Sequence, residues 1–202
     1  EMRLAFRLAF TVAALGAVFA FSLAAGIADD LFGLGGGGLG VLSTSLGVGS
    51  LVASAYISGR GAHVARSVME HRSIVLYGLG LVVVAASGWL AVGVIGYLSM
   101  GMAHMLHGTT LSTAIQMRVD EAYRGRVMSV FLVAILSGIP VGGLAFGILG
   151  DLVGLRWVVL AAGVALLSGA VALQRRGLLD MLDRDVADES NPVAEATDSR
   201  DD

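Results

Sequence analysis

The chain has 202 residues, of which 56% are hydrophobic and only 14% are charged, and its formal net charge is −3. Soluble domains carry about 25% charged residues, so this composition excludes an ordinary water-soluble domain and predicts an integral membrane protein. Cysteine is absent, which excludes disulfides and thiolate metal ligands. The four histidines have no acidic neighbours at ligand spacing. We therefore expect no metal, no cofactor and no nucleic-acid partner.

Six apolar runs are long enough to cross a bilayer as helices, which takes about 20 residues each. In chain order they cover residues 4–28, 39–58, 73–87, 90–114, 127–150 and 153–173. The run from 73 to 114 is too long for one span, so a tight turn near Ser87 and Gly88 must divide it. The sequence thus predicts an all-α bundle over residues 1–176, with small residues throughout that let helices pack closely.

Residues 177–202 form a separate, acidic segment. From Asp180 onward it holds nine acidic residues and two arginines, a net charge of −7. Such a polar, self-repelling composition predicts a disordered, solvated tail.

A G-x-G-x-x-G pattern occurs between the first two spans, at Gly33, Gly35 and Gly38. A dinucleotide site would need a β-strand before this pattern and a helix after it. A long apolar run precedes it instead. We therefore expect these glycines to allow a sharp, close-packed entry into the second helix rather than to bind phosphate.

The arginines alternate between the loops and predict the orientation. All thirteen basic residues are arginines, and the loops that would lie outside carry Asp29, Asp30, Asp151 and a single arginine, Arg156. By the positive-inside rule, both termini and the second and fourth loops face the cytoplasm of a multi-pass protein in the cell membrane. The arginines expected on that side are Arg3, Arg7, Arg60, Arg66, Arg72, Arg118, Arg124, Arg126, Arg175 and Arg176.

Residues 116–156 carry three linked motifs. The first is Q-x-x-V-x-x-x-x-R-G-R-V-x-S, followed by P-x-G-G-x-x-x-G and by G-x-L-x-D-x-x-G-x-R. The residues that fill these motifs are Gln116, Val119, Arg124, Gly125, Arg126, Val127, Ser129, Pro140, Gly142, Gly143, Gly147, Leu149, Asp151, Gly154 and Arg156. This region resembles the major facilitator superfamily, in the branch of drug and siderophore exporters that includes enterobactin and macrolide efflux proteins.

The resemblance implies a secondary active transporter, and the six spans are similar to the C-terminal half of its twelve-helix fold. Its partners would be a hydrophobic or amphipathic small molecule, protons, the lipid bilayer, and a missing N-terminal half of the same chain or a second half-transporter. One departure concerns residues 58–72, SGRGAHVARSVMEHR, which hold only a degenerate form of the family's G-x-L-x-D-R-x-G-R-R loop and lack its aspartate. That weakens the case for an ion-paired latch in this loop.

Two histidines are the candidates for proton coupling. His104 and His107 are three residues apart, which puts them on one face of the fourth expected helix. Histidine titrates near neutral pH, and ionisable residues at membrane depth usually face a cavity or a partner. The alternative is a neutral histidine hydrogen-bonded to a neighbouring helix. No Asp or Glu falls within the expected spans, so a coupling carboxylate would have to lie in the missing half.

The other candidate sites come from the three motifs. Gln116, Arg124, Gly125 and Arg126 mark the cytoplasmic loop, where the arginines either pair with Asp120 or Glu121 as a latch or serve only as topogenic charge. Within the fifth span, Pro140 predicts a kink, and Gly142, Gly143 and Gly147 predict a close-packed face. At the outer turn, Asp151, Gly154 and Arg156 predict a local ion pair or cap.

Three functions remain open on these grounds. A secondary exporter fits the motifs, and we expect no enzymatic activity. The alternative is a non-transporting membrane subunit or scaffold. It differs from the exporter in that its activity would not depend on His104. An intramembrane serine protease is a remote third possibility, because Ser87 and Ser137 lack a G-x-S-G surrounding. A channel is disfavoured by the absence of a charged ring or filter sequence.

Overall fold

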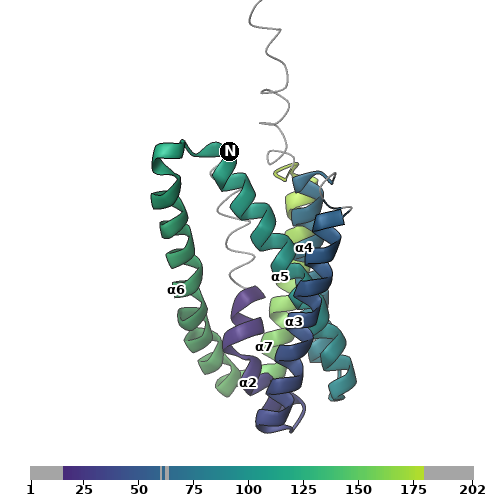
Figure 1. The fold of residues 1–202 in the computed structure, drawn as a ribbon. Coiled ribbons are helices and arrows are strands. Elements are labelled where there is room, and N and C mark those ends of the chain that lie inside the picture. The colour runs from purple at the N-terminus through teal and green to yellow at the C-terminus, as the bar shows by residue number, and fades with distance from the viewer. Residues whose placement is uncertain (1–15, 60, 62–63, 180–202) are drawn as a thin grey trace, which may run out of the picture.

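The computed structural model describes residues 16–59, 61 and 64–179, and this part of the chain is helical, with no strand (Figure 1). Five of its helices are long and apolar enough to cross a membrane. The all-α membrane fold predicted from the sequence is thereby confirmed. The elements are η1 (Val18–Ser22), α2 (Ala24–Gly26), η2 (Ile27–Leu31), α3 (Gly35–Gly59), α4 (Arg66–Ala86), α5 (Leu90–Arg118), α6 (Glu121–Val153) and α7 (Leu155–Arg175).

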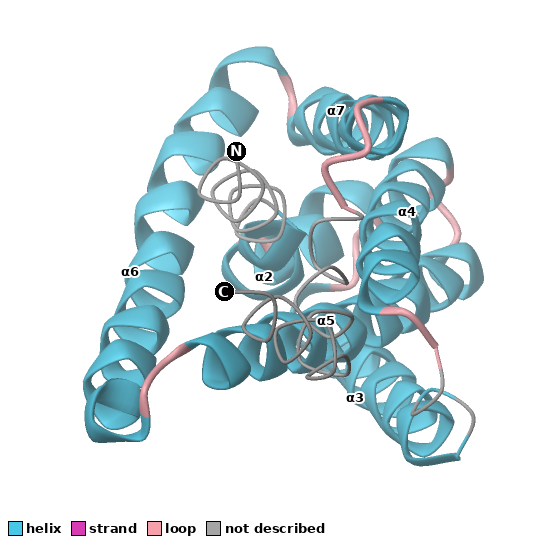
Figure 2. Ribbon diagram, turned by 90° about the horizontal axis from the view of Figure 1, so that it is seen from above, coloured by secondary structure: helices cyan, strands magenta, loops and turns pink. Residues whose placement is uncertain are grey.

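Four of the long helices form a packed bundle. Helix α5 lies against α3 and α4, and α4 also lies against α7. Figure 2 shows the segment that contains α2 lying between this bundle and α6, which stands apart. No residue of α6 is buried. The core is therefore centred on α4 and α5, with Tyr77, Tyr97 and Phe19 among its fully buried side chains.

The backbones of α3 and α5 approach each other at glycine. A Cβ atom added at Gly49 would collide with the Leu98 carbonyl oxygen, and one at Gly101 would collide with that of Leu46. The hydroxyl of Ser50 donates across this contact to the Gly101 carbonyl at 3.1 Å. Close approach of this kind is how small residues drive helix association in lipid.

The first helical segment is irregular. Its described part begins at residue 16 and includes two π-helical turns, η1 and η2, on either side of the short α2. The rest of the expected span 4–28 lies outside the described residues. Single π-helical turns within helices occur frequently at functional sites. Of the two turns here, η1 lies beside α5 and α6.

The glycine-rich stretch joins two helices, as expected. It follows η2 rather than a strand, and α3 begins at Gly35. Gly33 and Gly35 have φ values of +67° and +49°, a region that only glycine adopts at little cost. The stretch therefore turns the chain sharply into α3.

The helices extend beyond the apolar runs at several ends. The largest difference concerns α4, which begins at Arg66, whereas the apolar run begins at residue 73. Hydropathy marks the part of a helix that can face lipid, but backbone hydrogen bonding continues into polar flanks. Residues 66–72 thus belong to a helix, and Glu70 lies within it rather than in a loop.

The bundle continues past the expected boundary at residue 176. Leu179 is buried and packs with Ile74, Ala170 and Leu173. The acidic segment 180–202 lies outside the described residues, so its disorder stays a prediction.

Candidate functional site

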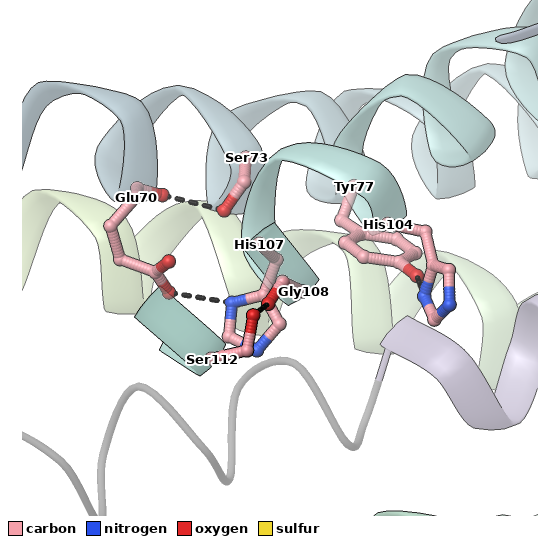
Figure 3. A network of polar contacts seen from close by, with 7 residues as sticks. All are labelled: Glu70, Ser73, Tyr77, His104, His107, Gly108 and Ser112. Atoms are coloured by element: carbon pink, nitrogen blue, oxygen red, sulfur yellow. Dashed lines mark hydrogen bonds and ion pairs between the residues drawn. The ribbon is translucent and has the colours of Figure 1, made fainter. Parts of the chain in front are cut away.

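Polar side chains meet in two pairs along the seam between α4 and α5 (Figure 3). One pair joins Tyr77 to His104, and the other joins Glu70 to His107. Each pair takes one member from each helix. Since α4 and α5 both lie in a bundle expected to cross the membrane, these polar groups satisfy each other where water is scarce.

His104 lies at the middle of α5 and is held from two sides. The Tyr77 hydroxyl and His104 Nδ1 are 2.8 Å apart, and the hydroxyl can donate to a bare nitrogen or accept from an N–H group. The Phe21 ring of η1 packs edge-on against the imidazole, with centroids 5.0 Å apart. His104 is only half-buried. The imidazole is therefore oriented by α4 and by the irregular first segment while part of it stays accessible.

His107 is paired with a buried carboxylate. Its Nδ1 lies 2.8 Å from Glu70 Oε1, and the two side chains are 8% and 0% exposed. The Ser73 hydroxyl donates to the Glu70 backbone carbonyl at 2.7 Å. Among the residues that the structure describes, Glu70 Oε2 has no hydrogen-bond partner. The structure thus places an acidic residue inside a helix of the bundle.

Hydropathy alone does not reveal Glu70, because the apolar run of α4 begins at residue 73, after this side chain. The available indication was helical spacing. Extended back to Arg66, the helix puts Glu70 three residues before Ser73 and seven before Tyr77, on one stripe of its surface. That stripe is the one that faces α5.

The arginine motif lies at an exposed end of the molecule. The connection between α5 and α6 is only Val119 and Asp120, and Arg124 and Arg126 occupy the first turns of α6. Gln116, both arginines and Gly125 are exposed. Within the described residues, no ion pair joins these arginines to Asp120 or Glu121. The proposed latch is therefore not formed in this conformation.

The glycine motif of α6 faces the first segment. A Cβ atom added at Gly142 would collide with the Val18 side chain, and one at Gly143 would lie 2.6 Å from Ser22 Cβ. Ser22 donates to the Ile139 carbonyl at 2.9 Å. Gly147 lies 3.9 Å from Leu23 by the same measure, and α6 continues through Pro140. The motif thus lies where α6 meets η1.

The turn between α6 and α7 passes through Gly154, whose φ is +92°. Arg156 donates from Nη1 to the Ala85 carbonyl at 2.8 Å, near the end of α4. Asp151 is exposed. The structure therefore gives Arg156 a backbone partner on another helix, which the sequence analysis did not name.

No metal centre accompanies these residues. In the described part of the chain, no group of three or more histidine, aspartate or glutamate side chains comes close enough to hold a metal ion. The chemistry available at the α4–α5 seam is that of proton binding and hydrogen bonding.

Apolar spanning helices and buried polar pairs between them define a multi-pass helical membrane protein. The comparison with protein families assigns the chain more narrowly. The sequence model of the family described as transmembrane secretion effector matches residues 3–200. The chain belongs to this family of major facilitator superfamily transporters. No curated protein matched the chain.

Proposed function

We propose that this chain is the C-terminal, six-helix half of a proton-coupled exporter of hydrophobic or amphipathic small molecules, such as drugs or siderophores. Family membership supports transport in general. The order of the three motifs between residues 116 and 156 supports the C-terminal half and the drug and siderophore branch. On this proposal, the N-terminal half or a second half-transporter completes the protein in the cell membrane, and both termini are cytoplasmic.

The observation that carries the proton coupling is the setting of His104. An imidazole at the middle of a spanning helix is costly unless it has partners or a cavity. Here the Tyr77 hydroxyl lies 2.8 Å from Nδ1 of His104, and the Phe21 ring packs edge-on against the imidazole. The His104 side chain nevertheless stays half-buried. A positioned and partly accessible imidazole is suited to take up and release a proton. The remaining motif residues serve packing and gating in this proposal.

The test is to replace His104 with Gln in the complete protein, reconstituted in liposomes and supplied with ethidium as an amphipathic probe. Glutamine keeps hydrogen-bonding capacity but does not titrate. We expect gradient-driven ethidium accumulation to fall by about tenfold under a pH difference of about one unit, which supplies about 1.4 kcal/mol per proton. Downhill ethidium exchange should persist, because substrate contacts are retained.

The matched control is His71→Gln, the same substitution on α4 at a residue outside both polar pairs. It should leave accumulation unchanged. Normal gradient-driven accumulation in His104→Gln would remove His104 from the coupling mechanism. If the unmodified protein moves no probe under any gradient, the scaffold alternative is favoured instead.

A further inference from the structure

Glu70 is a buried carboxylate that the proposed role of His104 does not use. It lies on the second turn of α4 and is fully buried. Oε1 is 2.8 Å from His107 Nδ1, whereas Oε2 is buried and has no hydrogen-bond partner in the described part of the chain. One oxygen of the carboxyl group is therefore satisfied and the other is not.

This arrangement is unfavourable for a lasting negative charge. A buried carboxylate is stable when both oxygens are paired, because an uncompensated charge in a medium of low dielectric constant loses its hydration. One neutral imidazole satisfies only one oxygen. A bound proton removes the charge without any movement of the two side chains.

Other charged groups on the packed helices have other partners or lie elsewhere. On α4 itself, Arg72 donates to the Tyr56 hydroxyl of α3 at 2.8 Å. Arg66 reaches the Met117 sulfur near the end of α5. At the end of α7, the side chains of Arg175 and Arg176 are exposed.

Of the described histidines, neither His104 nor His71 has a hydrogen bond to Glu70. His104 on α5 is paired with Tyr77. His71, the neighbour of Glu70 on α4, lines a small cavity with Ser67 and Gln174, and its Nδ1 is buried without a partner among the described residues. Among the described residues, His107 is thus the titratable group placed to share a proton with Glu70.

We propose that Glu70 and His107 form a buried proton-binding site between α4 and α5. In the unloaded state, Nδ1–H of a neutral His107 donates to a Glu70 carboxylate, and the pair has a charge of −1. Uptake of one proton, on Oε2 of Glu70 or on Nε2 of His107, makes the pair neutral. Release returns that proton to water, so the two residues together hold and release a single proton.

Proton binding by Glu70 and His107 does not depend on the proposed function. Only its role, the coupling of proton movement to transport, rests on the proposal that the protein is an exporter. His104 lies one helical turn from His107 on α5. The pair thus supplies, within this chain, an acid of the kind that the sequence analysis assigned to the missing half.

The test is infrared difference spectroscopy of the complete protein in lipid nanodiscs, comparing acidic with alkaline buffer. We expect a carboxylic acid C=O band or an imidazolium ring band that appears on acidification and is lost in Glu70→Gln. His107→Gln keeps the carboxyl group but removes its partner, so the Glu70 band should remain while its dependence on pH changes. Glu121→Gln, the same change at an exposed carboxylate on α6, should retain the band.

A second measurement uses the unmodified protein in case the variants do not fold. Dicyclohexylcarbodiimide reacts with a protonated buried carboxyl group. The carboxyl oxygen adds across one C=N bond of the reagent while the carboxyl proton moves to nitrogen, and the resulting adduct rearranges to a stable N-acylurea. Mass spectrometry should find this adduct on Glu70, with labelling about tenfold faster in acidic than in alkaline buffer. Absence of a Glu70-dependent band, together with pH-independent labelling, would overturn the proposal and leave the pair as a fixed tie between helices. Neither measurement requires transport, so a failure of the exporter proposal would be seen separately.

Discussion

At the scale of single residues, two buried tyrosines make hydrogen bonds of unequal length, one across the α4–α5 seam and one between α5 and η1. The Tyr77 hydroxyl lies 2.8 Å from His104 Nδ1, near the optimum for a hydroxyl group. The Tyr97 hydroxyl lies 3.4 Å from the Phe19 carbonyl, which is long for such a bond. Both tyrosines are buried. Their rings contribute similar packing, so the two hydroxyl groups differ mainly in the partners that they satisfy.

Tyr77→Phe should therefore destabilise the protein more than Tyr97→Phe. Removal of the Tyr77 hydroxyl leaves His104 Nδ1 without its partner, and hydrogen bonds between membrane helices contribute about 0.6 kcal/mol on average and up to about 1.7 kcal/mol. We expect a loss near the upper end for Tyr77→Phe and a smaller one for Tyr97→Phe. Unfolding in mixed detergent micelles measures both, and equal losses would show that the Tyr77–His104 bond stabilises the protein no more than the Tyr97–Phe19 contact does.

The site was only half visible in the sequence at this scale. His104 and His107 stood out because histidine is rare within apolar runs. Their partners did not, since Tyr77 looks like an ordinary apolar-run residue and Glu70 lies among arginines that resemble a loop. Pairing between helices depends on which faces meet, and helical periodicity within one segment does not determine that.

At the scale of elements, glycine sets how closely the helices approach. Gly49 of α3 lies against the α5 backbone at Leu98, whereas nothing lies near a Cβ atom added at Gly47, two residues earlier in the same helix. The dense small residues predicted close packing in general. The particular glycines that make it are fixed by the crossing point of α3 and α5, which the sequence does not specify.

Gly49→Ala should accordingly destabilise the bundle, and Gly47→Ala should not. The added methyl group at Gly49 forces the two backbones apart, and overpacking of this kind costs about 1–3 kcal/mol, occasionally more. At Gly47 it meets open space and carries the helix-propensity advantage of alanine. Thermal unfolding followed by size-exclusion chromatography would compare the two variants, and similar melting temperatures would show that α3 and α5 are not in backbone contact.

At the scale of the whole molecule, composition was enough to predict a helical membrane protein, and the motifs in residues 116–156 were enough to predict the superfamily. Both rest on properties that are spread along the chain. The separate position of α6 was not predictable, because its apolar sequence is as suitable for burial as that of α4. Yet α6 contacts the rest mainly through η1 and α7, so its placement is decided by those interfaces rather than by its own hydrophobicity.

The orientation of the molecule gives the last prediction, which uses single cysteines at Gly36, Ala65 and Ala122 in the otherwise cysteine-free chain. Gly36 lies at the start of α3, and that helix, 25 residues or about 37 Å long, separates it from Ala65. Ala65 precedes α4 and Ala122 opens α6, so α4 and α5 together return the chain to the same side. All three positions are exposed.

With cytoplasmic termini, a membrane-impermeant maleimide applied to intact cells should label Gly36→Cys alone, and permeabilised cells should show labelling at all three. Labelling of Ala122→Cys in intact cells would reverse the orientation and place the arginine motif outside, against the charge distribution that led to the assignment.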